Sequence, residues 1–128
     1  MKATARPPAV AGQDRTPPDV ATMRATAALL LGPDDSPDVL PPAPADVDTL
    51  IAALRSHLEL ITPQVEEAAG KLAKESTPRY CALACVGEAR GKLSARPGPG
   101  AYGTVAYARR LARVLEALCA HHETLGEV

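Results

Sequence analysis

The 128-residue chain has no phenylalanine and no tryptophan, and three tyrosines are its whole aromatic content. β-Sheets favour aromatic and β-branched side chains, so this shortage counts against a sheet-rich fold. Hydrophobic residues still make up 46% of the chain, and they are mainly alanine, leucine and valine. Alanine and leucine are among the strongest helix formers. The composition therefore predicts a protein built from closely packed helices.

The chain also lacks a marked excess of charge, with 14 basic and 15 acidic residues and a net charge of −1. Dedicated non-specific nucleic-acid-binding proteins are usually strongly basic, so nucleic acid is not the favoured partner. No apolar run approaches the ~18 residues that indicate a transmembrane helix, and residues 1–18 lack the apolar core of a signal peptide. We therefore expect a cytoplasmic protein with no membrane partner.

Prolines and glycines divide the chain into segments. Residues 1–16 are polar, rich in proline and without hydrophobic periodicity, which predicts a disordered N-terminal arm. Residues 17–125 are long enough to form one domain with its own core. Within them, apolar residues recur at steps of three and four, which is typical of helices. We expect helices over residues 17–31, 47–73, 78–94 and 102–123, with the N-caps Thr16, Asp46 and Thr77.

The segment 47–73 carries the clearest pattern, a heptad-like seam of aliphatic residues. Its members are Val47, Leu50, Leu54, Leu58, Ile61, Val65, Ala68 and Leu72. A proline inside a helix removes one hydrogen bond and clashes with the preceding turn. Pro63 therefore predicts a kink after Glu59, or a new helix start capped by Thr62. Short connections between the later helices favour antiparallel neighbours, so the predicted fold class is all-α, an antiparallel up-down four-helix bundle.

Three runs resemble a family of small actinobacterial proteins, described as a domain of unknown function and loosely as natural-product-biosynthesis proteins. The runs are "ADVDTLIAALRSHLELITPQVEEAA", "PRYCALACVGEARGKL" and "GPGAYGTVAYARRLARVLEALCAHHE". The likeness covers roughly residues 20–123. It implies a helical fold and a host that makes secondary metabolites, and it supplies no reaction and no catalytic residue.

The glycine-rich turn "SARPGPGAYGTVAYARR" allows two interpretations. Glycines free the backbone, and a helix N-terminus offers unpaired N–H groups to an anion. However, no strand precedes the turn, Pro99 interrupts it, and no Lys-Ser/Thr pair follows. A hinge between two helices is the favoured interpretation, and an anion cradle stays open.

Antiparallel pairing also predicts which charged residues share one end of the bundle. The two later hairpins turn near residues 75 and 98, which brings seven basic residues together: Arg55, Arg90, Lys92, Arg96, Arg109, Arg110 and Arg113. Acidic residues are expected elsewhere: Asp34, Asp35 and Asp38 in the long loop, and Glu66, Glu67 and Glu75 toward the other end. A basic end attracts a phosphorylated ligand, nucleic acid or an acidic protein. The plainer alternative is an ordinary solvated face.

A possible metal site comes from the same pairing. Cys81 and Cys85 are one helical turn apart, and the hairpin places Cys119 and His122 near them. Two thiolates, a third thiolate and an imidazole are a ligand set that suits tetrahedral Zn²⁺. In an alanine-rich helix, however, cysteine is simply a small apolar residue. Core packing is favoured over a zinc site or a redox pair, so no cofactor is expected.

No arrangement in the sequence predicts catalysis. Glu66 and Glu67 are adjacent on a helix and point about 100° apart, so they do not converge as an acid–base pair does. We expect a non-catalytic helical interaction or accessory module that binds itself or another protein, and the resemblance links it to secondary-metabolite biosynthesis or its regulation. Two alternatives stay open: a small regulator whose basic end binds DNA or a phosphorylated ligand, and a zinc-stabilised helical protein.

Overall fold

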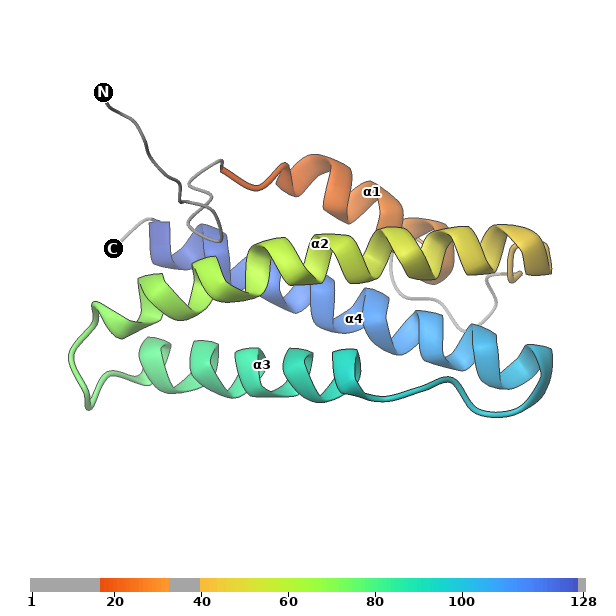
Figure 1. Ribbon diagram of the computed structural model, residues 1–128. Coiled ribbons are helices and arrows are strands. Elements are labelled where there is room, and N and C mark those ends of the chain that lie inside the picture. The colour runs from red at the N-terminus through yellow and green to blue at the C-terminus, as the bar shows by residue number, and fades with distance from the viewer. Residues whose placement is uncertain (1–16, 33–39, 127–128) are drawn as a thin grey trace, which may run out of the picture.

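The computed structural model describes residues 17–32 and 40–126, so the predicted arm at residues 1–16 lies outside the described residues. Four helices make up this part of the chain, with no strand among its residues (Figure 1). They are α1 (Val20–Leu31), α2 (Pro44–Gly70), α3 (Thr77–Ser94) and α4 (Gly100–Gly126). The all-α prediction is confirmed. In the described ranges, no helix combines the length and the apolarity needed to cross a bilayer.

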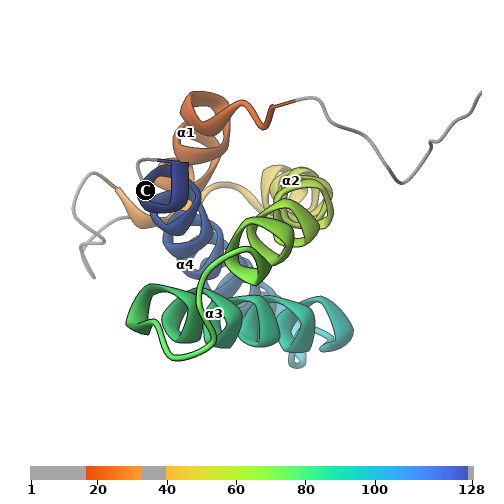
Figure 2. The same ribbon diagram turned by 90° about the vertical axis from the view of Figure 1, so that its left-hand side faces the viewer.

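The helices form an up-down bundle in which consecutive helices run in opposite directions (Figure 1). α2 and α4 pack most extensively on each other and form the centre of the bundle. α1 and α3 lie on opposite sides of this central pair (Figure 2), and they do not touch in the part of the chain that the structure describes. α1 packs mainly on α4, with a smaller contact to α2. The cross-section is therefore a rhombus whose short diagonal joins α2 and α4.

Aliphatic side chains fill the core at the positions that the helical periodicity predicts. The stripe of α1 contributes Met23, Ala27, Leu30 and Leu31, all of which are at most 1% exposed. From the seam of α2, the fully buried members are Val47, Leu54, Leu58, Ile61 and Val65. α4 supplies Ala108, Leu111, Ala112, Leu115 and Leu118. Tyr107, which is 2% exposed, was not predicted as a core residue and is the largest buried side chain.

The helix starts differ from the predicted caps by one to three residues. Asp19 caps α1, because its carboxylate accepts a hydrogen bond from the backbone N–H three residues later at 3.0 Å. The cap proposed at Thr16 lies outside the described residues. α2 begins two residues before Asp46, which lies in the first turn instead of capping it. Ser76, and not Thr77, caps α3. At α1 and α3 several capping residues stand close together and sequence alone does not choose between them. α2 instead starts after Ala43 with no side-chain cap and has Pro44 at its first position.

α2 continues through Pro63 as one helix, so the predicted restart capped by Thr62 is wrong. The axis of α2 bends in its C-terminal half, where the kink is predicted (Figures 1 and 2). Pro63 itself is exposed, whereas Thr62 is 2% exposed. The Thr62 hydroxyl has no hydrogen-bond partner among the described residues. The bend is therefore accompanied by one buried polar group that the helix leaves unsatisfied.

Candidate partner-binding site

The N-terminal halves of α2 and α4 extend beyond the ends of α1 and α3 (Figure 1). α2 and α4 have 27 residues each, whereas α1 has 12 and α3 has 18. At this end of the bundle two hollows flank the α2–α4 pair, and Asp48 and Thr104 line both of them. We call them the larger hollow, on the α1 side, and the smaller hollow, on the α3 side. Both exist because the outer helices are too short to cover the inner pair.

The larger hollow has a volume of about 940 Å³. One wall is the proline-rich segment 40–44 with the first turn of α2, and the other is α4 from Tyr102 to Arg113. Two large apolar side chains at its rim face solvent, with Leu40 85% exposed and Tyr102 88% exposed. Exposed large apolar groups that gather around a concavity are typical of interaction sites. This hollow therefore combines a shape and a surface chemistry that suit a partner.

Three arginines of α4 line the same hollow: Arg109, Arg110 and Arg113. The Nε of Arg109 donates a hydrogen bond to the Leu30 carbonyl oxygen of α1 at 3.3 Å, so this side chain also joins α4 to the end of α1. Arg110 and Arg113 are exposed. Among the described residues that line the larger hollow, Asp48 is the one acidic group. This described part of the lining carries an excess of positive charge.

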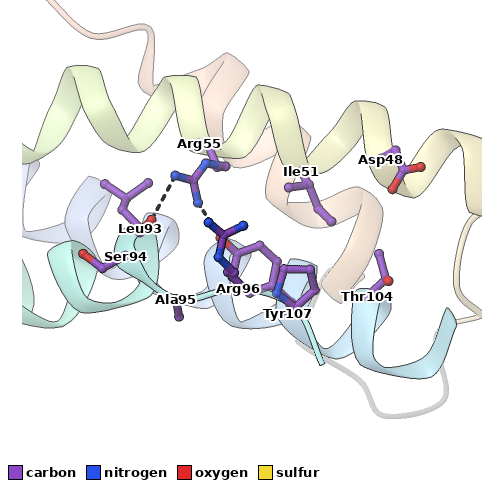
Figure 3. A pocket seen from close by; sticks show the side chains of 10 residues that line it. Asp48, Ile51, Arg55, Leu93, Ser94, Ala95, Arg96, Thr104 and Tyr107 are labelled. Atoms are coloured by element: carbon purple, nitrogen blue, oxygen red, sulfur yellow. Dashed lines mark hydrogen bonds between the residues drawn. The ribbon is translucent and has the colours of Figure 1, made fainter. Parts of the chain in front are cut away.

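The smaller hollow, of about 380 Å³, lies between α2, α4 and the chain that follows α3 (Figure 3). Arg55 projects from α2 and donates hydrogen bonds to the Tyr107 hydroxyl and, at 2.9 Å, to the Leu93 carbonyl oxygen. The Tyr107 hydroxyl in turn donates to the Lys92 carbonyl oxygen at 3.4 Å. Arg96 lines the outer part of the hollow and is exposed. Arg55 therefore serves chiefly to hold α2, α3 and α4 together.

Arg90 lies away from both hollows and forms an ion pair with Glu66. Its two terminal nitrogens donate to the two carboxylate oxygens at 2.9 and 2.8 Å. The hydrogen bond from Arg90 holds the pKa of the Glu66 carboxyl below its usual value, and the carboxylate raises the pKa of Arg90. The prediction that Glu66 and Arg90 lie at opposite ends of the bundle is thus wrong. They meet because α2 and α3 pack on each other and the long Arg90 side chain reaches the carboxylate.

The seven predicted basic residues consequently divide among four places. Arg109, Arg110 and Arg113 line the larger hollow, Arg55 and Arg96 line the smaller one, and Arg90 pairs with Glu66. Lys92 lies in the last turn of α3, where a cation is favourable beside the helix carbonyls. The acidic loop residues Asp34, Asp35 and Asp38 lie outside the described residues. The seven residues therefore do not form a single basic cluster at one end of the bundle.

Comparison with known proteins identifies the family to which the chain belongs. A family model described as a family of unknown function, DUF6415, matches residues 21–127. The chain belongs to the DUF6415 family. No curated protein and no solved structure matches it. The roles of individual residues in this DUF6415 protein are therefore argued from its own geometry.

Three arginines of the DUF6415 chain each bind the carbonyl end of a helix. Arg109 reaches the end of α1 and Arg55 the end of α3, as described above. Arg79 completes the set, because its NH1 donates to the carbonyl oxygens of Gly70, the last residue of α2, and of Leu72 in the turn that follows, both at 3.1 Å. The last carbonyls of a helix lack partners within it and carry partial negative charge. Sequence reasoning missed Arg79, although a basic residue just after a helix-ending turn is a recognisable signal.

The four residues proposed for zinc do not form a ligand set in the DUF6415 fold. Cys81 is exposed, whereas Cys85 and Cys119 are buried. The charge of Arg24 on α1 acts on the pKa of the Cys119 thiol, so Cys119 lies near α1. No three His, Cys, Asp or Glu side chains in the described ranges are arranged to hold a metal ion. Burial raises the pKa of both Cys85 and Cys119 to about 11, so these two thiols behave as core residues.

His122 lies at the opposite end of the DUF6415 bundle from the two hollows described above. It is half-buried and lines a third hollow, of about 260 Å³, together with Glu67 and Lys71. Its distance along α4 from the three rim arginines means that it contributes nothing to the larger hollow. The predicted link between His122 and the cysteines is therefore not observed.

The glycine-rich turn has the geometry of a hinge. Gly100 adopts a φ of 75°, a conformation that glycine tolerates best, at the first residue of α4. A Cβ added to Gly103 would lie 2.5 Å from the Gly98 carbonyl carbon. The backbone of the turn thus packs directly against the first turn of α4, where an anion would otherwise approach. These contacts support the hinge interpretation over the anion cradle.

Proposed function

We propose that this protein is a non-catalytic interaction module that binds a partner protein through the larger hollow. The observation that carries the proposal is the pair of exposed apolar side chains at its rim, Leu40 at 85% and Tyr102 at 88%. Large aromatic and aliphatic groups that are exposed in the free protein commonly become anchors when a partner buries them. The surrounding arginines would then form the polar rim of the interface.

The chemistry of the lining supports recognition more than catalysis. The exposed Arg110 and Arg113 carry guanidinium groups, which bind carboxylates in fixed geometry. General acid–base catalysis needs a titratable group held within hydrogen-bond reach of a reacting atom. Asp48 is the single carboxylate among the described residues that line the hollow, and it is exposed. We therefore propose a surface that recognises shape and charge.

The proposal keeps the biological setting that the sequence resemblance implies. The partner would be a cytoplasmic protein of secondary-metabolite biosynthesis or of its regulation, or a second copy of this chain. A regulator that binds DNA or a phosphorylated ligand has less support, because three of the seven basic residues already serve the fold. Arg55 and Arg109 bind helix ends, and Arg90 is paired with Glu66.

Affinity purification with matched tyrosine variants tests the proposal. The full-length chain is immobilised and exposed to a lysate of the host, and retained proteins are identified by mass spectrometry. Tyr102→Ala removes an aromatic side chain from the hollow, whereas Tyr80→Ala removes one that is 75% exposed on α3, away from it. We expect a partner that the native chain and Tyr80→Ala retain and that Tyr102→Ala loses. Equal retention by both variants would refute the proposed surface, and native mass spectrometry of the purified chain reports self-association.

A further inference from the structure

We infer that the larger hollow accepts an acidic amphipathic α-helix from the partner protein, an inference that rests on the function proposed above. The incoming helix would place an apolar face against Leu40 and Tyr102 and carboxylates against the α4 arginines. Three independent features of the hollow point to this occupant: where α1 ends, how charge is distributed, and how open the lining is.

The first feature is the missing length of α1. α1 covers the α2–α4 seam with 12 residues, while α2 and α4 have 27 each. Within the described residues, Arg109 marks the point where this cover ends, because it donates to the Leu30 carbonyl oxygen and also lines the hollow. Beyond that point the hollow continues along the same side of the inner pair. A helix from another protein would therefore extend the layer that α1 begins.

The second feature is the pattern of charge and apolarity. Val47 and Val105 line the floor together with the exposed side chains of Leu40 and Tyr102. Along one side, Arg109 and Arg113 are one helical turn apart on α4, and Arg110 lies beside them. From Tyr102 to Arg109, where α1 ends, the wall is about 10 Å long, and Arg113 lies one turn further along α4. An acidic helix that begins beyond the end of α1 would match both the apolar strip and the basic edge.

The third feature is the openness of the hollow. Pockets for small molecules usually bury 70–90% or more of the ligand. Here the rim residues Leu40, Tyr102, Arg110 and Arg113 are all exposed, so the hollow is a broad groove and not an enclosed pocket. Strand addition is another common way to bind a peptide, but the described residues offer no sheet edge. A helix is the peptide conformation that such a groove between helices accommodates.

Fluorescence anisotropy with defined synthetic peptides tests the inference. The probe is a fluorescein-labelled, side-chain-stapled peptide of about 14 residues, or four helical turns, with leucines on one face and glutamates on the other. One comparator has lysine at every glutamate position, and another has the same composition in an order that gives no apolar face. A 20-base-pair DNA duplex serves as competitor. The full-length chain is used throughout, with circular dichroism to confirm that each variant is folded.

We expect the glutamate peptide to bind at least about tenfold more tightly than the lysine peptide at low salt, because opposite charges at an interface favour binding and like charges oppose it. Arg110→Glu should lower the affinity for the glutamate peptide by about fivefold or more. Lys74→Glu, an equal charge reversal in the exposed turn after α2, should keep this affinity within about twofold of that of the native chain. The reordered peptide should bind weakly, and DNA should not displace the probe.

Equal binding of the acidic and basic peptides, an unaffected Arg110→Glu variant, equal binding of the reordered peptide, or displacement by DNA would each overturn the inference. Failure here is distinguishable from failure of the proposed function. If Tyr102→Ala loses its native partner and the glutamate peptide does not bind, the hollow binds a partner of other chemistry. If Tyr102→Ala loses no partner, the proposed surface itself is wrong.

Discussion

Replacing Thr62 with valine should stabilise this protein. Thr62 is 2% exposed, and its hydroxyl has no hydrogen-bond partner among the described residues. Valine has nearly the same shape and the same β-branching, so it should occupy the site without repacking. It also keeps a β-branched residue before Pro63, which leaves the backbone preference at the bend unchanged. The variant therefore isolates the hydroxyl.

The expected magnitude follows from the cost of burying an unpaired hydroxyl, about 1–3 kcal/mol in mutational data. Thr62→Val removes that cost and places a methyl group in an apolar setting. We expect the free energy of unfolding to rise by about 1–3 kcal/mol. For a domain of this size, each kcal/mol raises the melting temperature by about 4 °C.

Urea and thermal denaturation, followed by circular dichroism at the helical signal, measure the effect. The urea midpoint should increase while the slope m stays constant, which shows that stability and not the denatured state has changed. Thr49→Val is the matched control on the same helix, because Thr49 is exposed and its hydroxyl donates to the Ala45 carbonyl oxygen at 3.3 Å. The control should shift stability by about 0.5 kcal/mol at most.

A Thr62→Val variant that is no more stable than the native chain would refute the reasoning. It would mean that the hydroxyl is satisfied in solution, by a carbonyl freed at the bend or by a buried water. The Thr62 hydroxyl at the Pro63 bend would then not lower the free energy of unfolding.

Three further predictions concern the turn, the thiols and one ion pair. Gly103→Ala should destabilise the chain by about 1–3 kcal/mol, because the new Cβ would meet backbone at 2.5 Å. Gly91→Ala, which has open space around it, should stabilise the chain by about 0.5–1 kcal/mol. The same denaturation assay measures the change in the free energy of unfolding for both variants. Ellman's reagent should modify exposed Cys81 rapidly and buried Cys119 slowly at pH 8, because burial raises the pKa of the latter to about 11; equal rates would contradict the described burial. Glu66→Gln should cost less than about 1 kcal/mol at pH 7, since the pair is half-exposed. The pKa of this carboxyl is lowered in the folded state, so its contribution is present above its usual value of 4.5 and is lost as the pH falls; melting temperatures of variant and native chain should converge near pH 3.

The fold was predictable because one physical signal, the helical spacing of aliphatic residues, repeats along the whole chain. The seam from Val47 to Val65 fixed both the existence of α2 and the face that it buries. Helix ends were less predictable, because adjacent candidates such as Ser76 and Thr77 compete for the same cap. Tyr107 was missed as a core residue because its hydroxyl is satisfied by Arg55, a partner 52 positions away.

The candidate site was predictable only in part. The level of Arg55 beside the end of α3 followed from antiparallel pairing, and its hydrogen bond to the Leu93 carbonyl agrees with that level. The contact between Arg90 and Glu66 did not follow, because it depends on the offset between two helices and on side-chain reach. The larger hollow depends on where α1 stops relative to α2 and α4. The periodicity of apolar residues encodes neither the side-chain reach that joins Arg90 to Glu66 nor the point where α1 stops relative to α2 and α4.

The packing of α1 on α4 has a consequence for biosynthesis. The hydrogen bond from Arg109 to the Leu30 carbonyl joins residues 79 positions apart. At translation rates of about 5–20 residues per second, the apolar stripe of α1 waits roughly 4–16 seconds before its principal partner leaves the ribosome. During that interval its smaller contact with α2 is the one helix contact that the described residues offer to shield it. The nascent chain should therefore be most exposed to chaperone binding and proteolysis through its first helix, even though the finished bundle buries that helix well.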